Sequence, residues 1–241
     1  MKIKDSTITF WFQKQLEPKI FVDKFNEGLS ENFSLFNIID VPSNIDALIP
    51  RLTSFSKSNH SCIEVSQINV RFRTNFDDNY SSDINQCLEY IKDRTLKLFD
   101  ILKKCNIDVV YSAIFINLEK KEDNAVEKIN KQFLKLEDSK LDEIGIRMSK
   151  IINNKFYCNV CFNSSVQVKI EKEFENNHAE IILPLVSLSD TKEAIKYLNV
   201  SIELTDKLAY NLDSSYYTSN EELLELFDLV LSKLKKEINR F

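Results

Sequence analysis

The sequence predicts an α+β fold in which an antiparallel, curved sheet carries long helices on one face. Consecutive short segments alternate apolar and polar residues with a period of two, which is typical of meandering strands. The helical segments each carry one apolar stripe, so each has a single face to bury against a sheet. The order of elements in residues 1–105, β-α-β4-α, recurs in residues 106–241 as β-α-β5-α. We therefore expect two pseudo-repeated halves that share one core.

The first half is expected to begin with a strand and to end with a long helix. Pro18 stands where a helix can begin, and Val22, Phe25 and Leu29 follow it at helical spacing. The strands of this half are expected at 8–12, 33–41, 52–56, 62–66 and 68–74. The long helix is expected at 82–104, with a buried stripe of Leu88, Ile91, Thr95, Leu98 and Leu102.

The second half is expected to follow the same plan with one additional strand. Its strands are expected at 109–118, 143–152, 155–163, 166–172, 180–188 and 198–205, and its helices at 124–136 and 220–240. Ser219 and Glu222 form the capping-box pattern at the start of the last helix. The stripe expected on that helix is Leu224, Phe227, Leu231, Leu234 and Ile238.

This element order resembles the duplicated fold of the TATA-box-binding protein, and the resemblance covers most of the chain. It implies a curved sheet whose concave face is free, but no residue motif of that family occurs here, so it implies no functional residue. The chain is also similar to an uncharacterised, sporadically distributed family of bacterial proteins, through the strand Asn69-Val70-Arg71-Phe72 and the terminal helix that follows a strand at 201–204. That similarity implies a prokaryotic protein linked to mobile elements or phage defence.

Composition excludes several mechanisms. Gly28 and Gly145 are the only glycines, whereas phosphate-binding loops and dinucleotide fingerprints need several glycines close together. A nucleophile elbow of the G-x-S-x-G type is absent. The net charge of −5 also disfavours a dedicated nucleic-acid binder, because phosphate contacts supply much of the affinity of such proteins.

Cysteine usage and hydropathy indicate a cytoplasmic protein. The five cysteines are an odd number without framework spacing, which fits reduced thiols. The longest apolar runs are far shorter than a bilayer span, and the first residues do not form a secretory signal. We therefore expect a soluble, cytoplasmic chain without a membrane segment.

The stretch KFYCNVCFNS contains the one close pair of cysteines, Cys158 and Cys161. A zinc site would need both thiolates on one side of a turn. As a strand the stretch sorts into two faces, and residues three apart point to opposite sides of a strand. The apolar face is Phe156, Cys158, Val160 and Phe162, and the other face is Tyr157, Asn159, Cys161 and Asn163. We expect a strand here, and neither a metal nor a cofactor in the protein.

The titratable residues that remain suggest little catalysis. His60 and His178 lie in polar stretches that are typical of hairpin tips, where a histidine is usually solvated. Asp77 and Asp78 precede a helix, where acidic side chains suit the N-terminus. A metal-binding role for this carboxylate pair is the alternative interpretation.

Four residues are candidates for contacts on a sheet face. Arg71 and Arg73 alternate with apolar neighbours in NVRFRTN and therefore share one face of a strand. Tyr157 and Asn159 occupy the equivalent face in the second half and would extend this surface.

The tyrosine-rich segment 206–219 supplies three further candidates. Connections of this length are often functional, and Tyr offers a large contact area at low entropic cost. Tyr210, Tyr216 and Tyr217 either contact a partner or pack the segment onto the domain.

The function that the sequence favours is non-catalytic: an intracellular protein that binds another macromolecule or a second copy of itself. The first alternative is a nucleic-acid-binding module that uses the concave sheet face with Arg71 and Arg73. The second alternative is a metal-dependent hydrolase with its site near Asp77 and Asp78.

Overall fold

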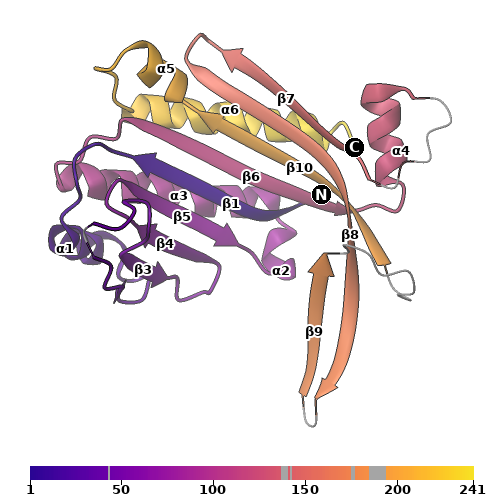
Figure 1. The fold of residues 1–241 in the computed structure, drawn as a ribbon, viewed down its shortest axis with the longest axis horizontal. Helices are drawn as coiled ribbons and strands as arrows, with labels where there is room; N and C mark the ends of the chain where they lie inside the picture. The colour runs from indigo at the N-terminus through magenta and orange to yellow at the C-terminus, as the bar shows by residue number, and fades with distance from the viewer. Residues whose placement is uncertain (43, 137–140, 142, 175–176, 185–193) are drawn as a thin grey trace.

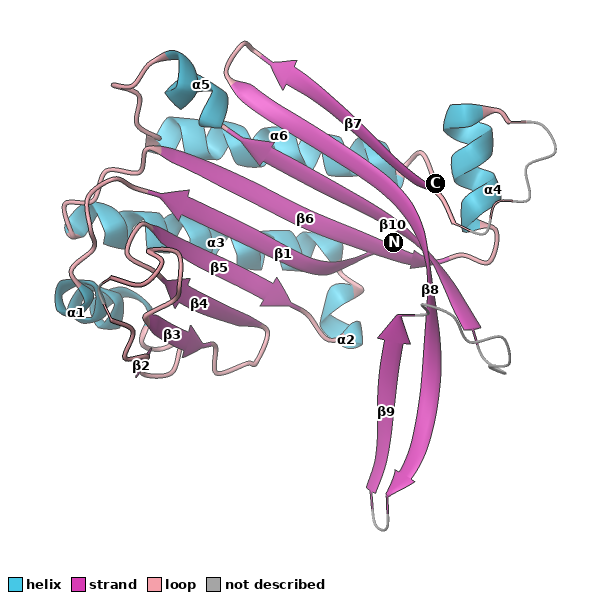
Figure 2. Ribbon diagram, in the orientation of Figure 1, coloured by secondary structure: helices cyan, strands magenta, loops and turns pink. Residues whose placement is uncertain are grey.

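The computed structural model contains one antiparallel sheet with helices packed against it (Figures 1 and 2). It describes all residues except 43, 137–140, 142, 175–176 and 185–193, and for 167–174, 177–184 and 194 it describes the backbone alone. Nine strands follow one another in the order β2-β3-β4-β5-β1-β6-β10-β8-β7, and β9 pairs with the outer part of β8. The strands are β1 (Lys2–Trp11), β2 (Asn37–Ile38), β3 (Leu52–Phe55), β4 (Ser61–Val65), β5 (Asn69–Asn75), β6 (Tyr111–Lys121), β7 (Gly145–Ile152), β8 (Phe156–Phe174), β9 (Asn177–Pro184) and β10 (Ala194–Thr205).

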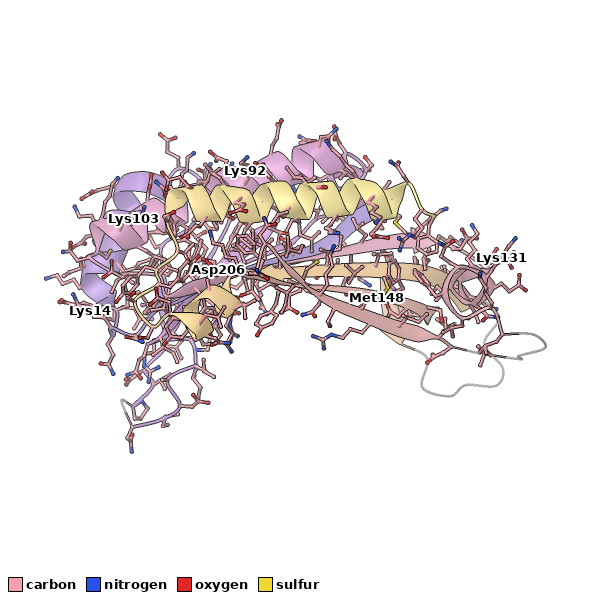
Figure 3. The ribbon with its side chains drawn as sticks, turned by 90° about the horizontal axis from the view of Figure 1, so that it is seen from above. Lys14, Lys92, Lys103, Lys131, Met148 and Asp206 are labelled. Carbon is pink, nitrogen blue, oxygen red and sulfur yellow. The ribbon has the colours of Figure 1, made fainter. Side chains whose placement is uncertain are left out.

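The two long helices, α3 and α6, lie on the same side of the sheet (Figure 3). The helices are α1 (Pro18–Leu29), α2 (Asp78–Ser81), α3 (Ile84–Lys104), α4 (Ala125–Ile129), α5 (Lys207–Leu212) and α6 (Asn220–Ile238). A π-helical turn, Asn130–Leu134, continues α4 and ends at Lys135, whose φ of 53° is left-handed. The predicted α+β class, antiparallel sheet and placement of the long helices on one face are confirmed.

The hydrophobic core fills the space between the sheet and these helices. Along β1, Ile8 and Phe10 are buried, and Phe10 packs on Phe99 of α3 with ring centroids 5.5 Å apart. Burial of each such side chain contributes roughly 1.5–3 kcal/mol, so the sheet is anchored mainly by this layer. One continuous cluster of buried residues runs from Ile3 to Leu234.

Several predicted strands are wrong in extent. The strand expected at 8–12 begins six residues earlier and is β1, Lys2–Trp11. The strand expected at 33–41 is reduced to Asn37–Ile38 and an isolated bridge between Phe33 and Ser56. The two strands expected at 155–163 and 166–172 are one strand, β8. The strand expected at 180–188 begins earlier, at Asn177, and is described as far as Pro184, so the rest of that prediction lies outside the described residues.

The capping box of α6 is confirmed, but the predicted stripe is shifted. The Ser219 hydroxyl accepts from the Glu222 N–H at 3.2 Å, and the Glu222 carboxylate accepts from the Ser219 N–H at 2.7 Å. Leu224, expected in the core, is 37% exposed. The buried face is instead Leu223, Leu226, Phe227, Val230, Leu234 and Glu237. Paired apolar residues such as Leu223-Leu224 satisfy either phase of the helical period, so the sequence alone did not fix the rotation.

None of the helices in the described part of the chain has both the length and the apolar character needed to cross a bilayer.

Candidate functional site

The predicted contact residues come together on the sheet face that is turned away from α3 and α6, which we call the open face. Paired residues in an antiparallel sheet point to the same side, so the strand register defines this face. One row of paired residues across the sheet is Arg73, Thr7, Phe115, Glu203 and Asn159. The next row is Arg71, Thr9, Ala113, Thr205 and Tyr157. In each row, four strand spacings of about 4.8 Å place the end residues about 19 Å apart.

Polar contacts hold both ends of the first row. The Arg73 guanidinium forms an ion pair with Glu64 at 2.8 Å. A hydrogen bond to the neighbouring Cys62 thiol and the charge of Glu64 raise the pKa of Arg73. At the other end, Asn159 Nδ2 donates to Glu203 Oε2 at 2.8 Å. These side chains are therefore positioned before any partner binds.

Charges elsewhere on the open face are also balanced. Lys4 Nζ donates to Glu119 Oε2 at 2.7 Å. Asn117 Nδ2 donates to Asp5 Oδ2 at 3.1 Å, while burial raises the pKa of that carboxyl. Carboxylates therefore lie among the cations of this face and pair with Arg73 and Lys4.

Aromatic side chains gather at the end of the open face next to α5. Trp11 stacks on Tyr111 with ring centroids 5.6 Å apart, and Tyr111 contacts Tyr210 at 5.7 Å. Gln13 Nε2 donates to the Tyr210 hydroxyl at 2.8 Å, and the Lys207 ammonium lies 5.4 Å from the centroid of the Tyr111 ring. Burial raises the pKa of the Tyr111 phenol. Tyr210 therefore packs onto the sheet face. Packing onto the domain was one of the two interpretations that the sequence offered for this segment.

The other tyrosines of this segment have different environments. The Tyr216 hydroxyl donates to Asp206 Oδ2 at 2.8 Å, so this side chain packs the segment onto the domain. Tyr217 is 47% exposed and is free to contact a partner.

Asp206 is the buried anchor of this connection. Its carboxylate is fully buried and accepts from the Ser112 N–H at 2.6 Å and from the Thr218 hydroxyl at 2.7 Å, in addition to Tyr216. Burial raises the pKa of Asp206, although the three donors favour the carboxylate. The Asp206 carboxylate thereby links the start of segment 206–219 to β6 and to the residues that precede α6.

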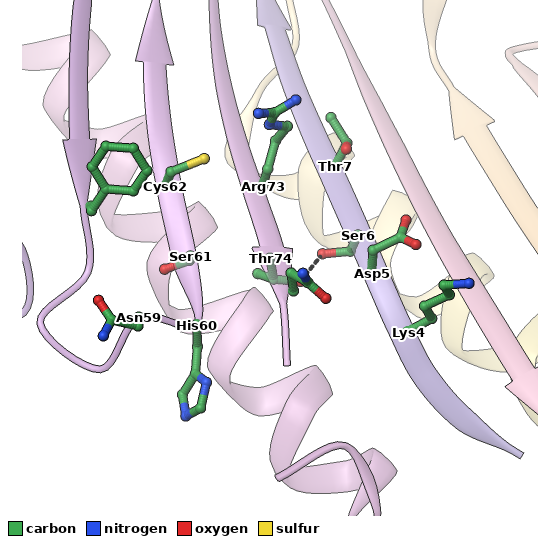
Figure 4. A pocket seen from close by; sticks show the side chains of 12 residues that line it. Lys4, Asp5, Ser6, Thr7, Asn59, His60, Ser61, Cys62, Arg73 and Thr74 are labelled. Carbon is green, nitrogen blue, oxygen red and sulfur yellow. Dashed lines mark hydrogen bonds between the residues drawn. The ribbon is translucent and has the colours of Figure 1, made fainter. Parts of the chain in front are cut away.

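A pocket of about 460 Å³ opens on the same face, over β4, β5 and β1 (Figure 4). Cys62 of β4 and Arg73 of β5 extend into it, and Lys4 and Asp5 approach from β1. His60 stands at the lower rim. This mixture of one thiol, two cations, one carboxyl and an imidazole can accept a polar side chain of a partner.

His60 lies in the hairpin connection between β3 and β4, as predicted, but it is not solvated. Its side chain is only 15% exposed, because its ring packs 4.7 Å from Tyr80 and 5.8 Å from Phe76. Its Nδ1 is 4.0 Å from Asp77 Oδ2. The side chain of His178 lies outside the described residues.

Asp77 and Asp78 lie at a helix N-terminus, as the favoured interpretation expected. The Asp77 carboxylate accepts from the Tyr80 N–H at 2.8 Å and caps α2. Asp78 forms an ion pair with Lys2. Both carboxylates therefore have structural partners within the chain.

The stretch KFYCNVCFNS is part of β8, as predicted. Cys158 is buried toward the helices, and Cys161 lies on the open face opposite Ser201 and Arg147. Burial raises the pKa of the Cys158 thiol. All five cysteines are free, and no cluster of three or more His, Cys, Asp or Glu side chains suited to a metal occurs among the residues that the structure describes.

Neither a scan of protein-family models nor a search of curated protein sequences gives a match to this chain.

Sequence reasoning missed several residues of the open face. Trp11 and Tyr111 were not selected, although each stands next to a stretch of alternating residues and is the kind of side chain that contributes strongly to interfaces. Glu64, Glu119 and Glu203 were also missed. Their positions depend on pairing between strands distant in sequence, which a single sequence does not display.

Proposed function

We propose that this chain is a non-catalytic, intracellular interaction module that binds another protein through its open face. The observation that carries the proposal is the set of Arg71, Trp11, Tyr111, Tyr157 and Tyr210, which gathers on this face from both halves of the chain. Arg, Trp and Tyr are the residue types that most often dominate protein–protein binding energy.

The balance of charge supports a protein partner over nucleic acid. Arg73 and Lys4 are already paired with Glu64 and Glu119, at 2.8 Å and 2.7 Å. The sugar–phosphate backbone of a nucleic acid would approach these carboxylates as well as the cations. Repulsion by the carboxylates reduces the affinity that the release of counterions supplies. Glu203 adds a further carboxylate to the same face. The nucleic-acid alternative therefore remains second, and the structural roles of Asp77 and Asp78 give the hydrolase alternative no support.

We also propose that the two halves, 1–105 and 106–241, arose by duplication, as in proteins with the TATA-box-binding-protein topology. The strand order supports this: β1 lies beside β5 and β6 lies beside β10, so the first strand of each half pairs with its last. Further outward lie β4, β3 and β2 in the first half and β8 and β7 in the second, while β9 pairs with β8, and β1 and β6 meet at the centre. The free cysteines support a reducing compartment.

The test places a photo-crosslinking amino acid at single positions in the protein expressed in its own cells. We expect one protein to be captured from both Arg71 and Tyr157, because one partner would span about 19 Å of the face. Leu224, an exposed residue on the opposite, helical side, is the matched control. The purified partner should then bind the Arg71→Glu and Tyr157→Ala variants at least about tenfold more weakly, since each variant removes a contact of the hot-spot type.

Two outcomes would contradict the proposal. Equal capture from Leu224 would mean that the open face is not the contact surface. A crosslinked species that nucleases remove, together with affinity for single-stranded RNA or DNA that falls steeply with salt, would establish the nucleic-acid alternative.

A further inference from the structure

The two outer edges of the sheet differ sharply. On one side β2 has two residues, and such a short strand offers little backbone for pairing. On the other side β7 has eight residues, and its whole length is at least partly exposed to solvent. β7 pairs with β8, and in the described part of the chain no other strand pairs with it (Figure 1). A row of unpaired backbone groups is therefore available along this edge.

Both faces of β7 carry exposed apolar side chains. Met148 is 39% exposed and lies on the side of the helices, opposite Val160 of β8. Ile151 is 54% exposed and lies on the side of the open face, opposite Tyr157. An incoming strand would cover both, since its side chains alternate between the same two sides.

Two lysines meet beside this edge. Lys150 lies opposite the buried Cys158 in the register and therefore faces the helix side. There it contacts Lys233 of α6, and this contact, with burial and the charge of Lys236, lowers the pKa of Lys233. None of the ion pairs between described residues involves any of these three lysines.

A carboxylate one helical turn from Lys233 is already engaged. Glu237 of α6 is buried and forms an ion pair with Arg240 at 2.9 Å. A lysine on an edge strand by itself discourages pairing between copies of a chain. This effect explains Lys150 but not Lys233, which lies against it. Repulsion between the two ammonium groups costs free energy, and an acidic side chain placed between them would offset that cost.

We propose that β7 is a docking edge for an extended, acidic segment of a partner protein. The segment adds to the sheet as an antiparallel strand beside β7. It places a carboxylate between Lys150 and Lys233, and apolar side chains over Met148 and Ile151. Main-chain hydrogen bonds supply affinity in this mode of recognition, and the side chains supply selectivity.

The charges argue against a second copy of this chain as the occupant. A β7–β7 pairing would bring cations of both copies together on each side of the seam, Arg147 on the open-face side and Lys150 on the helix side, and like charges close together across strands are destabilising. The docking edge adjoins Tyr157 at one end of the open face, because Ile151 lies opposite Tyr157. It uses the free backbone edge and the lysines of the helix side, which the open-face function does not, so protection of 145–152 tests this inference separately from crosslinking at Arg71.

The test uses the full-length protein and the synthetic heptapeptide Val-Val-Glu-Thr-Val-Glu-Val. Its third residue is designed to face Lys150 and its sixth Arg147 when it runs antiparallel to β7 from Ile152 to Ile146. The matched control peptide has Lys in place of both Glu. Amide chemical shifts give the Kd, and hydrogen exchange shows which strand is protected.

We expect protection over 145–152 and a Kd about tenfold lower for the Glu peptide than for the Lys peptide, because two cross-strand attractions become repulsions. Lys150→Glu should reverse part of this preference. If that variant does not fold, Lys150→Gln should reduce the preference about threefold, since it removes one of the two attractions.

Three results would overturn the inference. The first is equal affinity of the two peptides for the wild-type protein. The second is protection at other strands but not at 145–152. The third is a concentration-dependent dimer in sedimentation experiments that Met148→Lys dissociates, because a second copy would then occupy the edge.

Discussion

Replacement of Asp206 by Ala should destabilise the protein strongly. The carboxylate is fully buried and accepts three hydrogen bonds of 2.6–2.8 Å, from the Ser112 N–H and from the hydroxyls of Tyr216 and Thr218. A hydrogen bond to a charged group contributes about 1.5–3 kcal/mol, and a buried donor left without an acceptor costs about 1–3 kcal/mol. Repacking and water entry recover part of the loss, so we expect a decrease of about 4 kcal/mol in the free energy of unfolding.

Asp206→Asn keeps the shape of the side chain and removes its negative charge. The amide oxygen can still accept from Ser112, and the two hydroxyls can rotate to accept from the amide N–H groups. We therefore expect a loss of about 1–2 kcal/mol. Urea unfolding followed by circular dichroism and by fluorescence of Trp11, the single tryptophan, measures both values.

Asp100→Ala is the matched control, because Asp100 is exposed on α3. It should change stability by less than about 0.5 kcal/mol. The reasoning is refuted if Asp206→Ala lies within about 1 kcal/mol of the wild type, or if Ala is no worse than Asn at this position.

Three further predictions concern other parts of the molecule. Burial alone would raise the pKa of Glu222, but its ion pair with Lys155 at 2.9 Å lowers it overall. The advantage of the wild type over Glu222→Gln, about 1 kcal/mol, should therefore be complete above about pH 4.5 and disappear as the pH falls through the lower folded-state pKa, in urea titrations from pH 7 to 3. Phe72→Ala should cost about 3–5 kcal/mol in the same assay and Phe55→Ala less than about 1 kcal/mol, because Phe72 is fully buried and Phe55 is 54% exposed; equal losses would contradict this. Tyr217→Ala should leave stability within about 0.5 kcal/mol of the wild type, and a larger loss would show that this side chain packs and is not free for a partner.

The fold was predictable where local pattern and tertiary environment agree. Alternation in NVRFRTN and KFYCNVCFNS placed each residue on the correct face, because a half-buried sheet imposes a period of two. The strand prediction at 33–41 is wrong because local pattern and tertiary environment disagree there. Leu35 and Ile38 are about 80% exposed at the sheet edge, so their apolar character reflects no core contact within the chain.

The candidate site was predictable only in its separate parts. Sequence placed Arg71 and Tyr157 on non-core faces, but the register across three intervening strands is what puts them in one row. The same limit applies to Asp206, whose acceptor role depends on Ser112, a residue 94 positions away. The burial of His60 was not predicted, because its aromatic neighbours Phe76 and Tyr80 come from a different segment.

The position of the central strands explains why the open face can act as one surface. Arg71 belongs to the first half and Tyr157 to the second. Between them lie β1, β6 and β10, and β1 and β6 pair along nearly their whole length. Phe10 on the covered side of β1 packs on α3, and Ile116 on β6 belongs to the same buried cluster, so bending the sheet at this seam would open the core on the other side. The spacing between the two halves of the face is therefore fixed by the packing beneath it. A partner that contacts both ends binds a preformed surface and loses little affinity to reorganisation.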